Sequence, residues 1–372
     1  MNGTTRLGQP EGRDTAADIL KCLCCVSVVI IHTGSLGFTT YIVRSFNWAG
    51  SFFWTSLFRF CVPVFLMCSG ALLLNPAKEL SIRRILTHYF LRILAVLLVW
   101  SLLYDLYFVA AKFLLYGQYE PGSLWQAFFN TVTFRHYFHL YYLQILLIFY
   151  LFLPALRLFV QHADRRLYRY VLLIWFILGI ILPCLWQLEP MASNDGVPAQ
   201  YPMSTTYAAM GYTLLGWYLR SAGIRRADAK RYIGLFFAGY AVICLATVGI
   251  SLYIDTPYGG MMEAMTPGVA LMALGLYGTV SALVDGRGEM PRVARMAKAT
   301  FCIYLVHHMF VAALRATDLF HLYNVNELLG KIHPALGYCL FSIPLLSAAA
   351  LGMSILAYLI LSRIPFVRKY LI

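Results

Sequence analysis

A lysine and a histidine stand eleven positions apart in an apolar stretch near the start of the chain. Lys21 and His32 lie within DILKCLCCVSVVIIHTG, residues 18–34. In an α-helix eleven steps amount to about three turns, so both side chains would share a face about 16 Å apart. Ionisable groups in a membrane helix are unfavourable and usually functional. An imidazole takes up protons near neutral pH, so we expect His32 to be a general base; the alternative is a structural histidine bonded to a neighbouring helix.

The composition indicates the kind of protein that holds this pair. Of 372 residues 60% are hydrophobic and 12% are charged, whereas soluble domains carry about 25% charged residues. A polytopic helical bundle in contact with membrane lipids is therefore expected. Lys and Arg outnumber Asp and Glu by 29 to 16, but they lie in short loops, so we expect orientation in the membrane and no nucleic-acid partner. The polar first sixteen residues or so give no secretory signal.

The nine cysteines do not predict a metal site. Cys22 and Cys25 form a C-x-x-C, but no second pair completes a zinc site and no βαβ pattern surrounds it. We interpret them as small apolar packing residues and expect no metal.

About ten segments are long and apolar enough to span a bilayer. They are 17–37, 51–74, 88–115, 138–161, 167–188, 202–222, 231–253, 262–284, 297–317 and 336–362. Basic residues dominate alternate loops, which places both termini in the cytoplasm. No linker divides the chain, so we expect a single domain over 1–372 that includes a polar cytoplasmic segment, 1–16.

This orientation gives the buried polar residues a depth. His32 and Arg59 fall in the outer half of the membrane, and His139 opens the fourth segment at its outer edge. On the cytoplasmic side, three basic residues at four-residue intervals lead into the third segment: Arg84, His88 and Arg92. The last two, four apart, would share a helix face.

Four stretches resemble, in order, motifs of the integral-membrane acyltransferase-3 family. Lys21-x10-His32, preceded by Asp18, is similar to its Arg/Lys-x10-His signature. The others are FRFCVPVFLMCSGALLL (58–74), HLYYLQILLIFYLFLP (139–154) and FCIYLVHH (301–308), with a weaker likeness in GYTLLGWYL (211–219). The chain departs from the family at RRILTHYFLR, where the family often has Arg-x-x-Arg, and at His308, where Pro is common.

The resemblance implies transfer of an acyl group, usually acetyl from acetyl-CoA, to a hydroxyl of a carbohydrate or lipid-linked glycan. It implies that His32 is catalytic. It also makes His139 and His307 substrate-binding candidates, although either could simply bridge helices.

The remaining candidates each have a structural alternative. Arg59 has no acidic partner on its own helix and is expected to bind the oxyanion or the acceptor. Lys21 is expected to bind the donor, or else to snorkel or pair with Asp18. Arg84, His88 and Arg92 would bind the phosphates of CoA, unless they anchor the loop in the cytoplasm. Ser69 and Gly70 are expected to permit close helix approach.

We therefore predict an acetyl-CoA-dependent O-acetyltransferase of the bacterial inner membrane that modifies an envelope glycan. A transporter of a glycan or lipid-linked sugar is the alternative, since it would also place polar residues along a path through the membrane. It should show inverted repeats with broken helices, which we do not find in the sequence.

Overall fold

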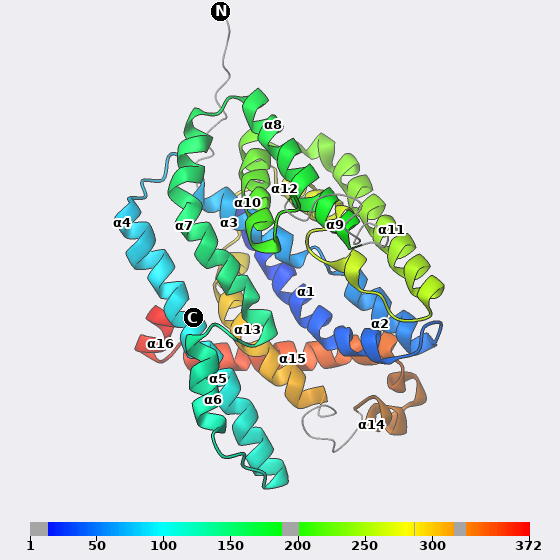
Figure 1. The fold of residues 1–372 in the computed structure, drawn as a ribbon. Coiled ribbons are helices and arrows are strands. Elements are labelled where there is room, and N and C mark those ends of the chain that lie inside the picture. The colour runs from blue at the N-terminus through cyan, green and yellow to red at the C-terminus, as the bar shows by residue number, and fades with distance from the viewer. Residues whose placement is uncertain (1–13, 188–200, 286, 316–324) are drawn as a thin grey trace, which may run out of the picture. The chain divides into compact units, whose positions relative to one another are not determined.

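The computed structural model describes residues 14–187, 201–285, 287–315 and 325–372, and it is 82% helical (Figure 1). Nine helical segments within these residues are long and apolar enough to cross a membrane. They are Thr15–Thr40, Phe46–Leu73, Ile82–Leu114, Phe138–His162, Arg165–Trp186, Arg226–Ile254, Gly260–Val284, Pro291–Leu314 and Cys339–Leu361. The predicted polytopic helical bundle is confirmed.

The nine segments correspond to nine of the ten predicted spans. The other predicted span, 202–222, is present as helix α10 (Thr205–Ala222). Although it has 18 residues, it is less apolar than the nine segments. The predicted and observed boundaries otherwise differ by a few residues.

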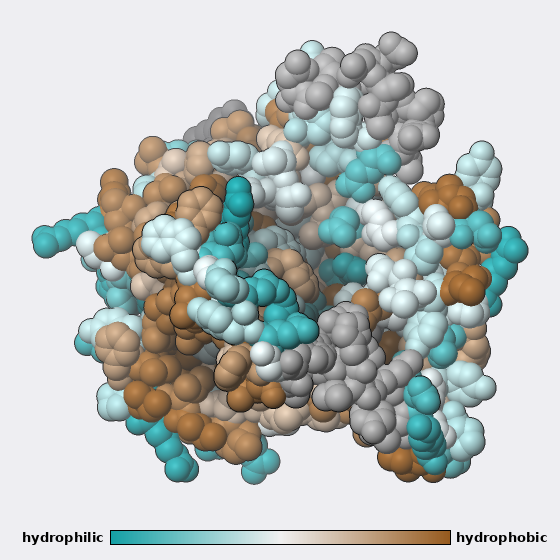
Figure 2. Space-filling view, turned by 60° about the horizontal axis from the view of Figure 1, so that its bottom comes forward, coloured by the Kyte–Doolittle hydropathy of each residue, from teal (hydrophilic) through white to brown (hydrophobic). Residues whose placement is uncertain are grey.

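The surface fits an apolar solvent. Many large apolar side chains are exposed, among them Leu245, Leu356 and Phe237. In Figure 2 hydrophobic residues cover wide areas of the face that is shown. Because such large apolar areas are rare on soluble monomers, the exposed side chains are those that lipid would contact.

The chain divides into two compact units. The first comprises residues 1–27, 56–85 and 148–298, and the second comprises 28–55, 86–147 and 299–372. Three long helices contribute to both units: α1 (Thr15–Thr40), α7 (Tyr141–His162) and α13 (Pro291–Arg315).

The first unit is built on close helix contacts at glycines. Besides α10, it contains α3 (Cys61–Leu73), α4 (Ile82–Arg84), α8 (Arg165–Phe176), η3 (Ile177–Ile181), α9 (Leu182–Trp186), η4 (Arg226–Asp228), α11 (Ala229–Ile254), η5 (Gly260–Met262) and α12 (Pro267–Val284). A Cβ on Gly70 of α3 would lie 1.9 Å from the backbone oxygen of Thr213 on α10. Conversely, a Cβ on Gly216 of α10 would lie 2.0 Å from the oxygen of Met67. The expected close approach at Gly70 is confirmed.

Two arginines of the first unit, the buried Arg157 and the partly buried Arg220, bond to other segments of the unit. Arg157 donates from Nη1 to the backbone oxygens of Leu73 (2.6 Å) and Asn75 (2.9 Å), and from Nη2 to that of Lys78. It thereby satisfies the last carbonyl of α3, which no helical N–H reaches, and two carbonyls of the loop that follows. Arg220 pairs with Asp14 at 3.1 Å. Both arginines therefore join separate segments of the unit.

The second unit contains the pairing of α5 with α13. Its further elements are α2 (Phe46–Leu57), η1 (Ile85–Phe90), α5 (Leu91–Tyr116), α6 (Ser123–Val132), η2 (Phe138–Leu140), α14 (Val325–Ile332), η6 (Pro334–Gly337), α15 (Cys339–Leu361) and α16 (Pro365–Tyr370). The hydroxyls of Tyr104 and Tyr107 donate to the backbone oxygens of Leu305 (2.8 Å) and Met309 (3.1 Å). From the first bond to the second, the position moves about one turn toward the C-terminus on both helices, so α5 and α13 run in parallel.

Two irregularities interrupt the second and third spans. The second span breaks between α2 and α3, at residues 58–60. Pro63 explains the break because it has no N–H and its ring clashes with the carbonyl of Arg59 in a regular helix. In the third span, α4 continues directly into the π-helix η1, which contains His88. Hydrogen bonds there run from i to i+5, so His88 and Arg92 do not have the regular α-helical spacing on which their shared face was predicted.

Candidate functional site

Four histidine rings form one compact cluster in the second unit. His32, His139, His307 and His308 have all six ring-centroid separations between 5.2 and 6.1 Å. His139, His307 and His308 are buried, whereas His32 is partly exposed. The structure thus brings together three residues predicted for catalysis and substrate binding and adds a fourth. We call these four rings the histidine cluster.

Three separate elements supply the histidine cluster. His32 comes from α1, His139 from the short helix η2 that opens the fourth span, and the other two from α13. The hydroxyl of Tyr304, also on α13, donates to the backbone oxygen of His139 at 2.6 Å. This bond fixes η2 against α13 and so holds His139 beside its neighbours.

The protonation of one ring follows from its hydrogen bond. Nδ1 of His307 lies 2.7 Å from the backbone oxygen of Tyr304. A carbonyl only accepts, so Nδ1 must carry the hydrogen and the neutral ring keeps an unprotonated Nε2. That Nε2 is buried and has no hydrogen-bond partner in the described protein. It is therefore available to accept a hydrogen bond from a ligand.

His139 offers a second set of available atoms. Its side chain is 1% exposed, and neither ring nitrogen has a hydrogen-bond partner in the described protein. Buried polar atoms in proteins are nearly always hydrogen bonded. A polar substrate would provide the partners that the surrounding side chains do not.

Aromatic side chains enclose the histidine cluster. Measured between ring centroids, Tyr104 lies 4.8 Å from His139, Tyr137 lies 5.0 Å from His308, and Phe138 lies 5.4 Å from His32. No site role was predicted for these rings or for His308. Adjacency to His307 was the one available signal for His308, whereas nothing in the apolar pattern distinguishes the aromatic residues from ordinary packing residues.

The chemistry that this cluster supports is proton transfer and hydrogen bonding. Neutral imidazoles can take a proton from a hydroxyl and donate to a developing oxyanion. Within the described ranges, no three or more His, Cys, Asp or Glu side chains are arranged to hold a metal ion.

Arg59 belongs to the first unit and lies in the break between α2 and α3. Its Nε is buried without a hydrogen-bond partner in the described protein. The break also places Arg59 outside a regular helix, which was not predicted from the sequence.

The residues predicted to bind the donor lie in different surroundings. Lys21 is partly exposed on α1, while Arg84 on α4 and His88 on η1 are exposed. Arg92 on α5 donates from Nη2 to the backbone oxygen of Ile372 at 2.7 Å. One guanidinium nitrogen that was predicted to bind phosphate therefore holds the C-terminal segment in this structure.

Comparison with known proteins identifies the family. No curated protein and no solved structure among those compared matches the chain. A model of the acyltransferase-3 family, described as an acyltransferase domain, matches residues 14–362, nearly the whole length. This range includes all four members of the histidine cluster and every other predicted site residue. The chain therefore belongs to the integral-membrane acyltransferase-3 family.

Proposed function

We propose that this membrane acyltransferase moves an acetyl group from cytoplasmic acetyl-CoA to a hydroxyl of an envelope carbohydrate or lipid-linked glycan, in the bacterial inner membrane. The observation that carries the proposal is the histidine cluster, in which buried ring nitrogens without protein partners surround the histidine of the Lys21-x10-His32 signature. A hydroxyl acceptor needs one group to take its proton and another to orient it.

In the proposed reaction His32 takes the proton of the acceptor hydroxyl as its oxygen attacks the thioester carbonyl. A tetrahedral intermediate forms, and its collapse breaks the carbon–sulfur bond. The CoA thiolate leaves and receives the proton from His32, so the products are the ester and free CoA. His32 suits this role because it alone in the histidine cluster is partly exposed, which lets it meet substrates.

The other histidines bind the acceptor in this proposal. The unprotonated Nε2 of His307 accepts a hydrogen bond from an acceptor hydroxyl, and His139 bonds a second polar group. For Arg59 we keep the role expected from the sequence, binding of the oxyanion or of the acceptor, because its buried Nε is without a protein partner and guanidinium is a strong donor to anionic oxygen.

The charged end of CoA binds at the cytoplasmic side through Lys21, Arg84, His88 and Arg92. Arg84 and His88 support this assignment because both are exposed and their backbones lie at the start of the third span. Arg92 contributes through the guanidinium atoms that do not hold Ile372.

The test follows CoA thiol release and the mass of the acceptor with purified protein in nanodiscs. We expect His32→Ala and His32→Gln to insert normally and to lose acyl transfer by about 10²-fold or more. His162→Gln is the matched control, because His162 is exposed at the end of α7. Transfer at the wild-type rate by His32→Ala would remove His32 from the mechanism. In sealed proteoliposomes, movement of the acceptor across the bilayer without a gain in mass would instead indicate a transporter.

A further inference from the structure

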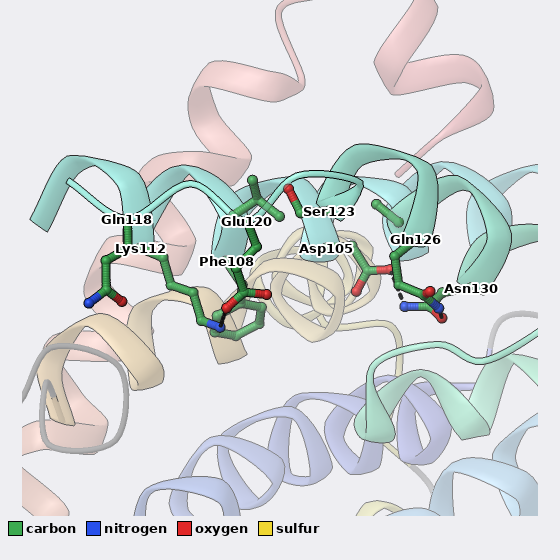
Figure 3. A pocket seen from close by; sticks show the side chains of 10 residues that line it. Asp105, Phe108, Lys112, Gln118, Glu120, Ser123, Gln126 and Asn130 are labelled. Atoms are coloured by element: carbon green, nitrogen blue, oxygen red, sulfur yellow. Dashed lines mark hydrogen bonds and ion pairs between the residues drawn. The ribbon is translucent and has the colours of Figure 1, made fainter. Parts of the chain in front are cut away.

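A polar pocket lies between α5 and α6, in the second unit. It has a volume of about 210 Å³ and is formed by the C-terminal half of α5, the connecting loop and one face of α6 (Figure 3). Its lining residues are Asp105, Phe108, Val109, Lys112, Gln118, Glu120, Ser123, Gln126, Ala127 and Asn130. Ligand sites for larger molecules measure about 300–1,000 Å³, so this pocket suits a group of the size of a single ring.

The polar groups of the pocket are held in place by one another. Asn130 donates to Asp105 at 3.3 Å, and Gln126 donates to Asn130 at 2.8 Å. Figure 3 shows Asp105 turned toward Asn130. A carboxylate has about four acceptor positions, so Asp105 can also accept from a ligand. The Oγ of Ser123 is buried and has no hydrogen-bond partner in the described protein.

The charge of the pocket selects against anions. Lys112 and Glu120 form an exposed ion pair at 3.5 Å. Their charges offset one another, which leaves the negative charge of Asp105. A phosphate, whether from CoA or from a lipid headgroup, would be repelled by that carboxylate. A neutral polyhydroxylated ligand would not be repelled, and its hydroxyls match the carboxylate, amide and hydroxyl groups of the wall.

The pocket adjoins the aromatic enclosure of the histidine cluster. The ring of Phe108 lines the pocket and stacks on Tyr137 at 4.9 Å, and Tyr137 in turn lies 5.0 Å from His308. Two ring contacts within one compact unit therefore connect the pocket to the cluster. The Phe108 ring also gives the pocket an apolar wall, against which the C–H face of a sugar can pack.

We infer that the α5–α6 pocket is a carbohydrate subsite that binds a neutral sugar ring of the acceptor, adjacent to the ring whose hydroxyl is acylated. Asp105, Asn130 and Ser123 bind its hydroxyls, and Phe108 packs against its apolar face. This inference rests on the proposed function, which supplies the reaction for which the sugar is an acceptor.

A binding experiment without any acyl donor tests the subsite. Saturation-transfer NMR would be recorded on the protein in nanodiscs with neutral disaccharides of glucose, galactose and N-acetylglucosamine, and with glycerol 3-phosphate as the anionic comparison. We expect saturable binding of at least one disaccharide and none of glycerol 3-phosphate. Asp105→Asn and Phe108→Leu should each weaken binding by about tenfold.

Glu327→Gln is the matched control, because Glu327 is an exposed acid on α14 outside the pocket. Gln126→Ala provides a second pocket variant at an exposed position should Asp105→Asn fail to fold. Absence of saturable binding by every disaccharide, or equal binding by wild type and the pocket variants, would overturn the subsite. A preference for glycerol 3-phosphate would overturn it as well.

The outcome is distinguishable from failure of the proposed function. If thiol release from acetyl-CoA is absent while a disaccharide binds through Asp105, the subsite stands and the acyl transfer fails. If transfer occurs, loss of a subsite should raise the KM for the acceptor with little change in kcat. Acyl transfer with an unchanged acceptor KM in Asp105→Asn would support the proposed enzyme activity and refute the proposed subsite.

Discussion

Replacement of His307 by asparagine separates acceptor binding from structural support. In the wild type Nδ1 donates to the backbone oxygen of Tyr304 at 2.7 Å, and the buried Nε2 has no protein partner. The amide nitrogen of asparagine can take the place of Nδ1 and keep that bond. No atom of asparagine reaches the place of Nε2. His307→Asn therefore removes the proposed contact with the acceptor and retains the contact within α13.

The size of the expected change in acceptor KM follows from the acceptor hydroxyl that loses its hydrogen-bond partner. An acceptor hydroxyl that enters a buried site without its hydrogen-bond partner costs about 1–3 kcal/mol. This corresponds to a rise of about 5- to 150-fold in the KM for the acceptor. Because the bond to Tyr304 is kept, the free energy of unfolding should fall by only about 1 kcal/mol.

The assay measures initial rates of CoA release against acceptor concentration at saturating acetyl-CoA, together with Tm. His162→Asn serves as the control for loss of an exposed imidazole. An acceptor KM within twofold of wild type in a folded His307→Asn variant would refute the assignment, since His307 would then only support the fold. A loss of kcat at unchanged KM would also refute it and would place His307 in the chemical step.

Three further changes have predicted outcomes. Gly70→Ala should lower the free energy of unfolding by about 2 kcal/mol or more in denaturant titration, because its Cβ would meet a backbone oxygen at 1.9 Å; Gly249→Ala, with nothing within 4 Å, should be neutral or stabilising. Arg157→Met should cost about 3 kcal/mol, because three carbonyls lose a charged donor. Burial lowers the pKa of His136, which lies outside the spans. Its neutral form therefore contributes fully to the free energy of unfolding above the ordinary pKa of histidine, and this contribution is lost as the pH falls below that value. The Tm should drop between about pH 7 and 5, and the drop should be smaller in His136→Gln.

The spans were predictable because hydropathy alone determines them. The segment predicted at 17–37 is the helix Thr15–Thr40, and the one predicted at 138–161 is Phe138–His162. The break at residues 58–60 was not predicted, although Pro63 is visible in the sequence. Proline is common in the first turn of a helix. Pro63 therefore interrupts a helix only if the residues before it belong to the same span, and the sequence does not show whether they do.

The candidate site was predictable only in part. His32, His139 and His307 were each singled out from the sequence, and the structure shows that they lie together although each comes from a different element. The partner of Arg92 was not predictable, because Ile372 lies 280 positions away and no local pattern reports such a contact. The α5–α6 pocket was missed for a related reason, since its polar residues are spread over two helices and a loop and meet only when the hairpin forms.

Under the proposed function, the charges along α5 give a physical reason for the donor and the acceptor to bind at different positions along this helix. Arg92 lies near the start of this helix, and Asp105 follows thirteen positions later, about 20 Å along the axis. The polyanionic end of CoA is attracted to the first of these positions and repelled from the second. A neutral sugar is not repelled by Asp105 and can hydrogen bond to it and to the other polar groups of the pocket. Reversal of the pocket charge by Asp105→Lys would remove this distinction, so that variant should become sensitive to inhibition by phosphate-bearing molecules from the outer side.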